Sequence, residues 1–126
     1  MKKLLTLILA LLAPLTLMAG PAEDISQEDL LKRMEEKKEQ VILDVRSDKE
    51  FKNGHIAGAK HIPFDELAKR VDELKDFKDT DIVIYCQSGR RAGIAAKTLK
   101  EAGFTKLLHL DGDWGAWSKN DRPFVK

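Results

Sequence analysis

The sequence predicts an α/β fold in which a parallel sheet of four to five strands carries helices on both faces. Residues 41–45 and 81–85 are short runs that are apolar apart from one aspartate each, as expected of strands buried on both faces. Segments with the apolar spacing of helices separate such runs. Strands that alternate with helices are typical of a parallel sheet, so a single domain of this kind is expected.

Helix-capping residues and apolar spacing place the other elements. Ser26 begins a helix that runs to about residue 38, with Asp29 as its partner in a start that is similar to a capping box. Ser47 and Glu50 form a second capping box, which starts a short helical turn. The remaining elements expected are an extended stretch at 60–62, a helix over 64–74, a helix over 92–102, a strand at 106–110 and a last short helix carrying Trp114 and Trp117.

Residues 1–22 have the pattern of a cleavable signal peptide. Two lysines follow Met1, residues 4–17 carry no charge and include eight leucines, and small residues come next. An uncleaved anchor is the alternative, but Pro14 and Gly20 interrupt an apolar run that is shorter than the ~20 residues needed to span a bilayer. We therefore expect residues 23–126 to be one exported domain in the bacterial periplasm, without stable membrane association after cleavage.

The charge of the expected mature domain argues against a nucleic-acid partner. Removal of Lys2 and Lys3 leaves 20 lysines and arginines against 21 acidic residues, a net charge of −1. This balance gives no basic excess to bind phosphate backbones. The sequence contains neither a Cys/His cluster for zinc nor a glycine loop of the P-loop type, so no cofactor is expected.

Cys86 is the only cysteine and the strongest candidate for chemistry. It follows the predicted strand 81–85 and begins the loop CQSGRR at 86–91, which leads into a helix. Unpaired amides at the helix start, together with Arg90 and Arg91, favour a thiolate. A buried, inert cysteine is the alternative, but the flanks are polar and cationic rather than apolar. In an exported chain a lone cysteine cannot form an internal disulfide, so it is expected to be either a free reactive thiol or an intermolecular partner.

Five motifs occur in the order seen in rhodanese-homology domains, which this sequence resembles over residues 25–117. The motifs are DVR at 44–46 with Glu50 and Phe51, GHIAGA at 54–59, HIP at 61–63, YCQSGRR at 85–91 and AGF at 102–104, completed by Leu110, Gly112 and Trp117. The architecture is similar to small periplasmic single-domain rhodaneses, including the phage-shock type. The family often has a second glycine where this chain has Asp113, a departure that bears on the rim beside the loop and on substrate preference.

The resemblance implies a sulfurtransferase. Cys86 would attack the outer sulfur of a small sulfur-containing anion such as thiosulfate, release sulfite, and pass the sulfur from a persulfide to cyanide or a thiol. Loop amides are expected to surround the sulfur, and the arginines to attract the anionic donor. The expected substrate-binding residues are Gln87, Ser88, Gly89, Arg90 and Arg91.

Supporting residues have more than one interpretation. Asp44 and Arg46 are expected to hold the base of the loop rather than to act as catalysts. Arg91 either contacts substrate or forms an ion pair with a carboxylate such as Asp44 or Glu50. His109 lies in a strand pattern and receives no function.

Two other functions use the same thiol. A phosphatase or arsenate reductase needs five residues between its cysteine and arginine, but Arg91 comes one residue too early after Cys86. A persulfide carrier that serves a protein partner also needs Cys86, so the sequence does not separate it from an enzyme.

Overall fold

The strand that leads into the candidate cysteine lies at the centre of the sheet. The computed structural model describes residues 20–126, and all four pairs of neighbouring strands are parallel, in the order β1-β5-β4-β2-β3. The strands are β1 (Glu23–Ile25), β2 (Val41–Asp44), β3 (Lys60–His61), β4 (Ile82–Tyr85) and β5 (Leu107–Leu110). The predicted parallel sheet with helices on both faces is confirmed.

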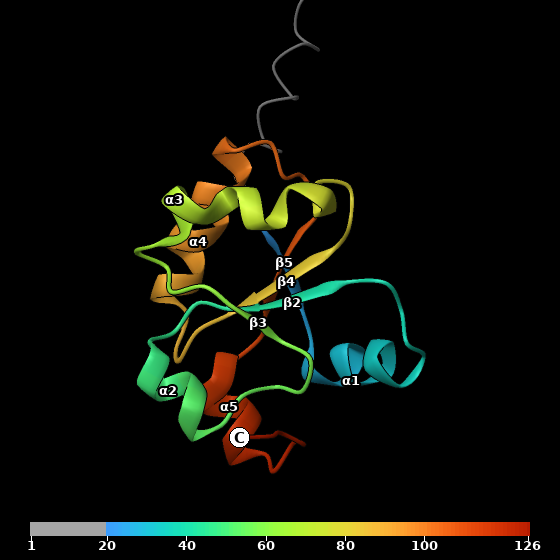
Figure 1. The fold of residues 1–126 in the computed structure, drawn as a ribbon. Coiled ribbons are helices and arrows are strands. Elements are labelled where there is room, and N and C mark those ends of the chain that lie inside the picture. Colours follow the sequence, from blue (N-terminus) through green and yellow to red (C-terminus); the bar gives the residue numbers. More distant parts are fainter. Residues whose placement is uncertain (1–19) are drawn as a thin grey trace, which may run out of the picture.

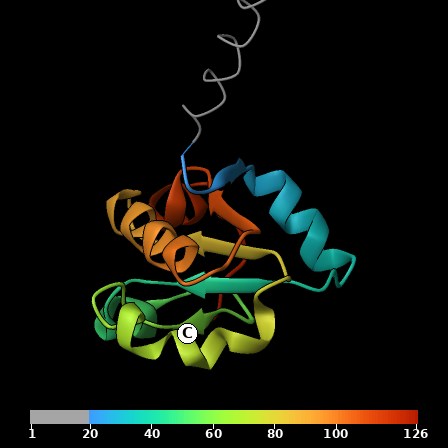
Figure 2. The ribbon, with the colours of Figure 1, turned by 90° about the horizontal axis from the view of Figure 1, so that it is seen from above.

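Helices cover both faces of this sheet (Figure 1). They are α1 (Gln27–Glu35), α2 (Asp48–Asn53), α3 (Leu67–Arg70) with the 3-10 helix η2 (Val71–Phe77), α4 (Arg90–Glu101) and α5 (Asp113–Lys119). α3 and α4 lie on one side of the sheet, and α1 and α5 on the other (Figure 1). The view turned by 90° looks onto the sheet and shows β4 between β5 and β2 (Figure 2).

Alternation along β4 supplies both cores. Ile82 and Ile84 belong to the cluster that packs with α3 and α4, whereas Val83 and Tyr85 belong to the cluster that contains Leu30 of α1. All four β4 residues are fully buried. A strand covered on both faces has no solvated side, which explains why its sequence is apolar throughout.

The helix starts agree with the sequence, and two other details differ. Ser26 caps α1 by accepting a hydrogen bond from the backbone N of Asp29, and Ser47 with Glu50 forms the complete capping box. α1 ends at Glu35 instead of residue 38, because Lys37 takes a left-handed conformation with φ of 54°. The apolar spacing over 64–74 becomes α3 followed by 3-10 turns.

The N-terminal edge strand is an element that the sequence analysis missed. β1 has only three residues, of which only Ile25 is buried, so it shows no alternation over a useful length. It pairs with β5. The predicted signal peptide at 1–22 lies outside the described residues except for its last three. Within residues 20–126, no helix has the length and apolar character needed to cross a bilayer.

The turn before α5 requires glycine at position 112. Gly112 has a φ of 77°, and a Cβ placed there would lie 2.4 Å from the Cβ of Ala116. Gly112→Ala should therefore destabilise the protein by at least about 1–2 kcal/mol. Gly93→Ala is the matched control, since Gly93 lies in α4 with nothing within 4 Å of the added methyl, and it should stabilise by about 0.5–1 kcal/mol. Denaturant unfolding measures both, and equal effects would contradict this account of the turn.

Candidate active site

Cys86 lies directly after β4, at the carboxyl edge of the sheet, and its sulfur is held by backbone amides. Sγ lies 3.0 Å from the N of Gly89 and 3.3 Å from the N of Ala92, and both amides donate to it. Gly89 reaches this position with a φ of 122°, a conformation that favours glycine. The cysteine is only 1 % exposed, so the thiol is more buried than its polar and cationic flanks suggested. Amides aimed at one atom form a concavity that suits an anion.

The first two carbonyl groups of the loop point toward α5. The N of Trp114 donates to the carbonyl of Cys86 at 2.9 Å, and the N of Gly115 donates to that of Gln87 at 3.0 Å. In a planar trans peptide the N–H points opposite to the preceding C=O, so the amides of Gln87 and Ser88 face away from α5. Gly115 permits this approach, because a Cβ there would lie 3.1 Å from the Gln87 oxygen.

Asp113 lies beneath the loop and not on its rim, which corrects the sequence-based expectation. Asp113 is 2 % exposed, and its carboxylate accepts a hydrogen bond from the N of Cys86 at 3.0 Å. The Nε2 of His109 lies 3.0 Å from both carboxylate oxygens. The hydrogen bond to Asp113 raises the pKa of His109 above its usual value, against the lowering effect of burial. His109, which received no function in the sequence analysis, therefore contacts Asp113, the residue that binds the N of Cys86.

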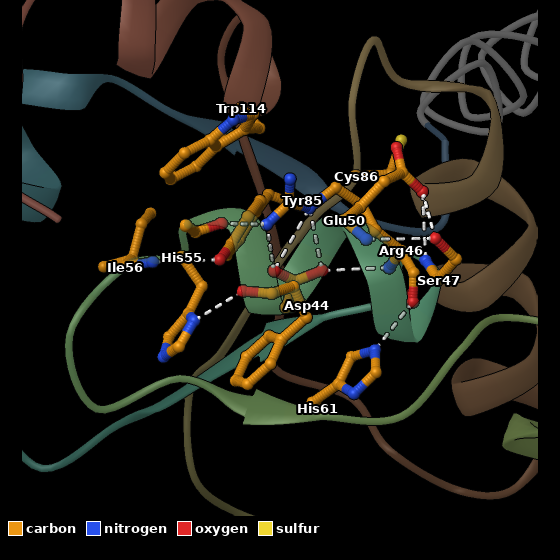
Figure 3. Close-up of polar contacts among 12 residues, drawn as sticks. Asp44, Arg46, Ser47, Glu50, His55, Ile56, His61, Tyr85, Cys86 and Trp114 are labelled. Carbon is orange, nitrogen blue, oxygen red and sulfur yellow. Dashed lines mark hydrogen bonds and ion pairs between the residues drawn. The ribbon is translucent and has the colours of Figure 1, made fainter. Parts of the chain in front are cut away.

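A buried ion pair joins Asp44, at the end of the neighbouring strand β2, to Arg46. Arg46 Nη2 lies 2.7 Å from Asp44 Oδ2, and also donates to the carbonyl of Gly54 at 2.7 Å. The guanidinium lies over the ring of Trp114, 4.6 Å from its centroid. Figure 3 shows this network beside Tyr85, the residue before the cysteine. Burial, reinforced by the Asp44 carboxylate, raises the pKa of the Tyr85 hydroxyl.

Arg91 forms the ion pair with Glu50. Its guanidinium nitrogens lie 2.7 and 3.0 Å from the two Glu50 oxygens, in bidentate geometry. These hydrogen bonds lower the pKa of Glu50 to about 2. Arg90 is exposed and remains placed to attract an anion. Among the two candidate partners of Arg91, the structure therefore selects the carboxylate of α2.

The predicted loop residues differ in what they contact. Gln87, Ser88 and Arg90 are exposed, while Gly89 forms part of the amide cradle. Within residues 20–126, histidine, cysteine, aspartate and glutamate side chains form no group of three that could hold a metal ion. The arrangement can therefore stabilise negative charge on a nucleophilic sulfur with backbone dipoles.

Sequence reasoning missed the contribution of α5 to this site. Its first turn supplies the Asp113 carboxylate and the amides of Trp114 and Gly115. The only signal was the departure from the family pattern at position 113. That signal marked the residue but contained nothing about its contacts, since the Cys86 amide lies 27 positions earlier.

Comparisons with known proteins agree on a family. The model of the rhodanese-like domain matches residues 26–120. A sulfurtransferase of Allochromatium vinosum is 32% identical over 102 residues, which are 81% of this chain and 94% of that protein. A Bacillus subtilis protein named for a proposed sulfur-carrier role is 36% identical over 100 residues, or 79% of this chain, which spans only 53% of that relative. The crystal structure of a rhodanese-related protein from Thermoplasma volcanium is 27% identical, with a TM-score of 0.72 over 82% of this chain and 97% of that one.

The two arginines should differ in their effects on stability. Arg91→Ala should lower the free energy of unfolding by about 1 kcal/mol at pH 7, because it removes a bidentate, partly buried ion pair. Arg90→Ala, the matched control at an exposed position, should stay within about 0.5 kcal/mol. Denaturant unfolding of both variants measures the difference.

The pH dependence has a definite sign. The folded-state pKa of Glu50 is depressed, so its stabilisation is present above its unfolded pKa and is lost as the pH falls from 4.5 toward about 2. The parent should therefore lose more stability than Arg91→Ala over that range. An equal loss in both proteins would mean that the ion pair contributes nothing.

Proposed function

Because this chain belongs to the rhodanese-like domain family, we propose that it is a sulfurtransferase that moves a sulfane sulfur through a persulfide on Cys86. Thiosulfate or a related anion is the donor, and cyanide or a thiol is the acceptor. The observation that carries the proposal is the amide cradle, in which Gly89 and Ala92 donate to Sγ. The sulfurtransferase relative, which this chain covers over most of its length, supports the same reaction class.

The first half-reaction forms one S–S bond and breaks another. The Cys86 thiolate attacks the outer sulfur of thiosulfate, and the bond between the two donor sulfurs breaks with its electron pair on the sulfite that leaves. The protein then carries a persulfide anion. In the second half-reaction cyanide attacks the terminal sulfur, which gives thiocyanate and returns the thiolate. Charge and atoms balance in both steps without an added oxidant or reductant.

The loop geometry suits the anions in these steps. The amides of Gln87 and Ser88 face away from α5, at the exposed end of the loop, where a terminal sulfur extending from Sγ can meet them. Arg90 adds an exposed positive charge in the same segment. An exposed cation raises the local concentration of an anionic donor and adds little to stability.

A persulfide carrier is the second candidate, and the sulfur-carrier relative favours it. An enzyme turns over many times on thiosulfate and cyanide, whereas a carrier delivers one sulfur per Cys86 to a protein acceptor. Counting thiocyanate produced per protein molecule separates the two.

Phosphatase chemistry fits the site less well. The arginine that would bind a phosphate is paired with Glu50, and it lies one residue too close to Cys86.

Cys86→Ser should abolish persulfide formation and leave the fold intact. A hydroxyl ionises far less readily than a thiol and cannot carry the sulfane sulfur. Intact mass after thiosulfate treatment should show one added sulfur atom on the parent and none on the variant, and cyanide should remove it. Parent protein alkylated beforehand with iodoacetamide is the control and should gain no sulfur. Sulfur transfer by Cys86→Ser would rule out Cys86 as the carrier.

A further inference from the structure

A buried carboxylate with a protonatable partner lies under the Cys86 loop, and the proposed reaction does not use it. Asp113 accepts a hydrogen bond from the N of Cys86 and contacts Nε2 of His109. It also borders the other end of the cradle. A methyl group added to Gly89 would lie 3.4 Å from Asp113 Oδ2 and 3.7 Å from Cε1 of His109. Asp113 therefore contacts the loop at Cys86, and both side chains lie close to Gly89, whose amide donates to Sγ.

The charge of this pair matters because the loop must hold an anion. An ionised Asp113 alone would oppose negative charge on the nearby sulfur, whereas a protonated His109 cancels most of that field. The other charged groups facing His109 are also acidic. Asp24 of β1 lies 3.9 Å from Nδ1, and Asp111 precedes α5. Each favours the protonated imidazole, and together with the hydrogen bond they raise the pKa of His109.

We propose that Asp113 is a positioning residue for sulfur transfer, holding the backbone of Cys86 from below, and that protonated His109 supplies the counter-charge. This inference rests on the proposed function. Asp113 fixes the orientation of the peptide between Tyr85 and Cys86 by accepting from its N–H. The carbonyl of the same peptide, on Tyr85, accepts a hydrogen bond from the N of Val45. Both sides of that peptide are thereby held. The positive charge of the imidazolium offsets the unfavourable electrostatic energy of a buried carboxylate beneath an anionic site.

The pair therefore makes the loop sensitive to pH. Below the pKa of His109 the pair is neutral, and above it the pair carries one negative charge beneath the sulfur. Reactions of Cys86 with anionic reagents should slow across that step relative to reactions with neutral reagents. We expect a change of about three- to tenfold for a charge coupled across a partly buried loop.

The test compares alkylation of Cys86 by iodoacetate and by iodoacetamide. Cys86 is the only thiol, so the label is unambiguous. Both reagents react with the thiolate, so the ratio of the iodoacetate rate constant to the iodoacetamide rate constant does not depend on the fraction of thiolate. This ratio reports the electrostatic field at the sulfur. Between about pH 5.5 and 9, which brackets the ordinary pKa of histidine, the ratio should fall in the parent. The same ratio is then compared with the rate of sulfur addition from thiosulfate.

Three variants are expected to change this ratio in different ways. His109→Gln retains a donor for Asp113 without the proton, so its ratio should stay low and flat. Asp113→Asn removes the negative charge and should move the step to lower pH, so its ratio should exceed that of the parent below its own step and above the parent's step. Asp24→Asn is the matched control, because it removes a carboxylate near His109 that does not contact the loop; its step should keep its size.

The outcomes separate this inference from the proposed function. A flat ratio in the parent, or the same step in His109→Gln, would overturn the charge pairing, whatever the protein does with thiosulfate. A purely structural Asp113 would change rates without changing the ratio. If the ratio behaves as expected but thiosulfate adds no sulfur to the parent, the pairing holds as a property of the loop, and its role in sulfur transfer is wrong together with the proposed function.

Discussion

The site depends on the hydrogen bonds between the Cys86 loop and the first turn of α5. The carbonyls of Cys86 and Gln87 are taken up by the amides of Trp114 and Gly115. With those acceptors turned toward α5, the following amides turn the other way, and the later amides of the loop reach Sγ. If the loop carbonyls were not held in this way, they could turn toward the sulfur, and an anion there would meet oxygen lone pairs instead of N–H donors.

The buried ion pair of β2 extends this support to the neighbouring strand. Arg46 joins Asp44 to the carbonyl of Gly54, and its guanidinium packs on the ring of Trp114, the residue whose amide holds the loop. Figure 3 shows how these groups gather next to Tyr85 and Cys86. Removing one partner of a buried pair leaves an uncompensated charge, at a cost of about 3–5 kcal/mol. The DVR motif therefore acts on the site through packing and charge.

Local patterns predicted what depends on local physics. The capping box of Ser47 and Glu50, the apolar strands and the loop with its cysteine all follow from short-range preferences, and the structure contains them. β1 was missed because three residues leave no periodicity to detect. The role of Asp113 was missed because it arises from a left-handed backbone, with φ of 55°, and from contacts across separate elements. Contacts between separate elements produce no periodic pattern in the sequence. The pairing of Arg91 with Glu50 could not be predicted for the same reason.

The claim that the loop is built to carry a sulfur can be tested by determining the crystal structure of the protein after treatment with thiosulfate. The account predicts one additional atom bonded to Cys86 Sγ at about 2.0 Å, the length of a sulfur–sulfur bond. That atom should lie within the concave face of the loop, with backbone amides directed at it, while the carbonyls of Cys86 and Gln87 stay paired with α5. An unmodified Cys86, or an added sulfur lying outside the amide cradle, would contradict it.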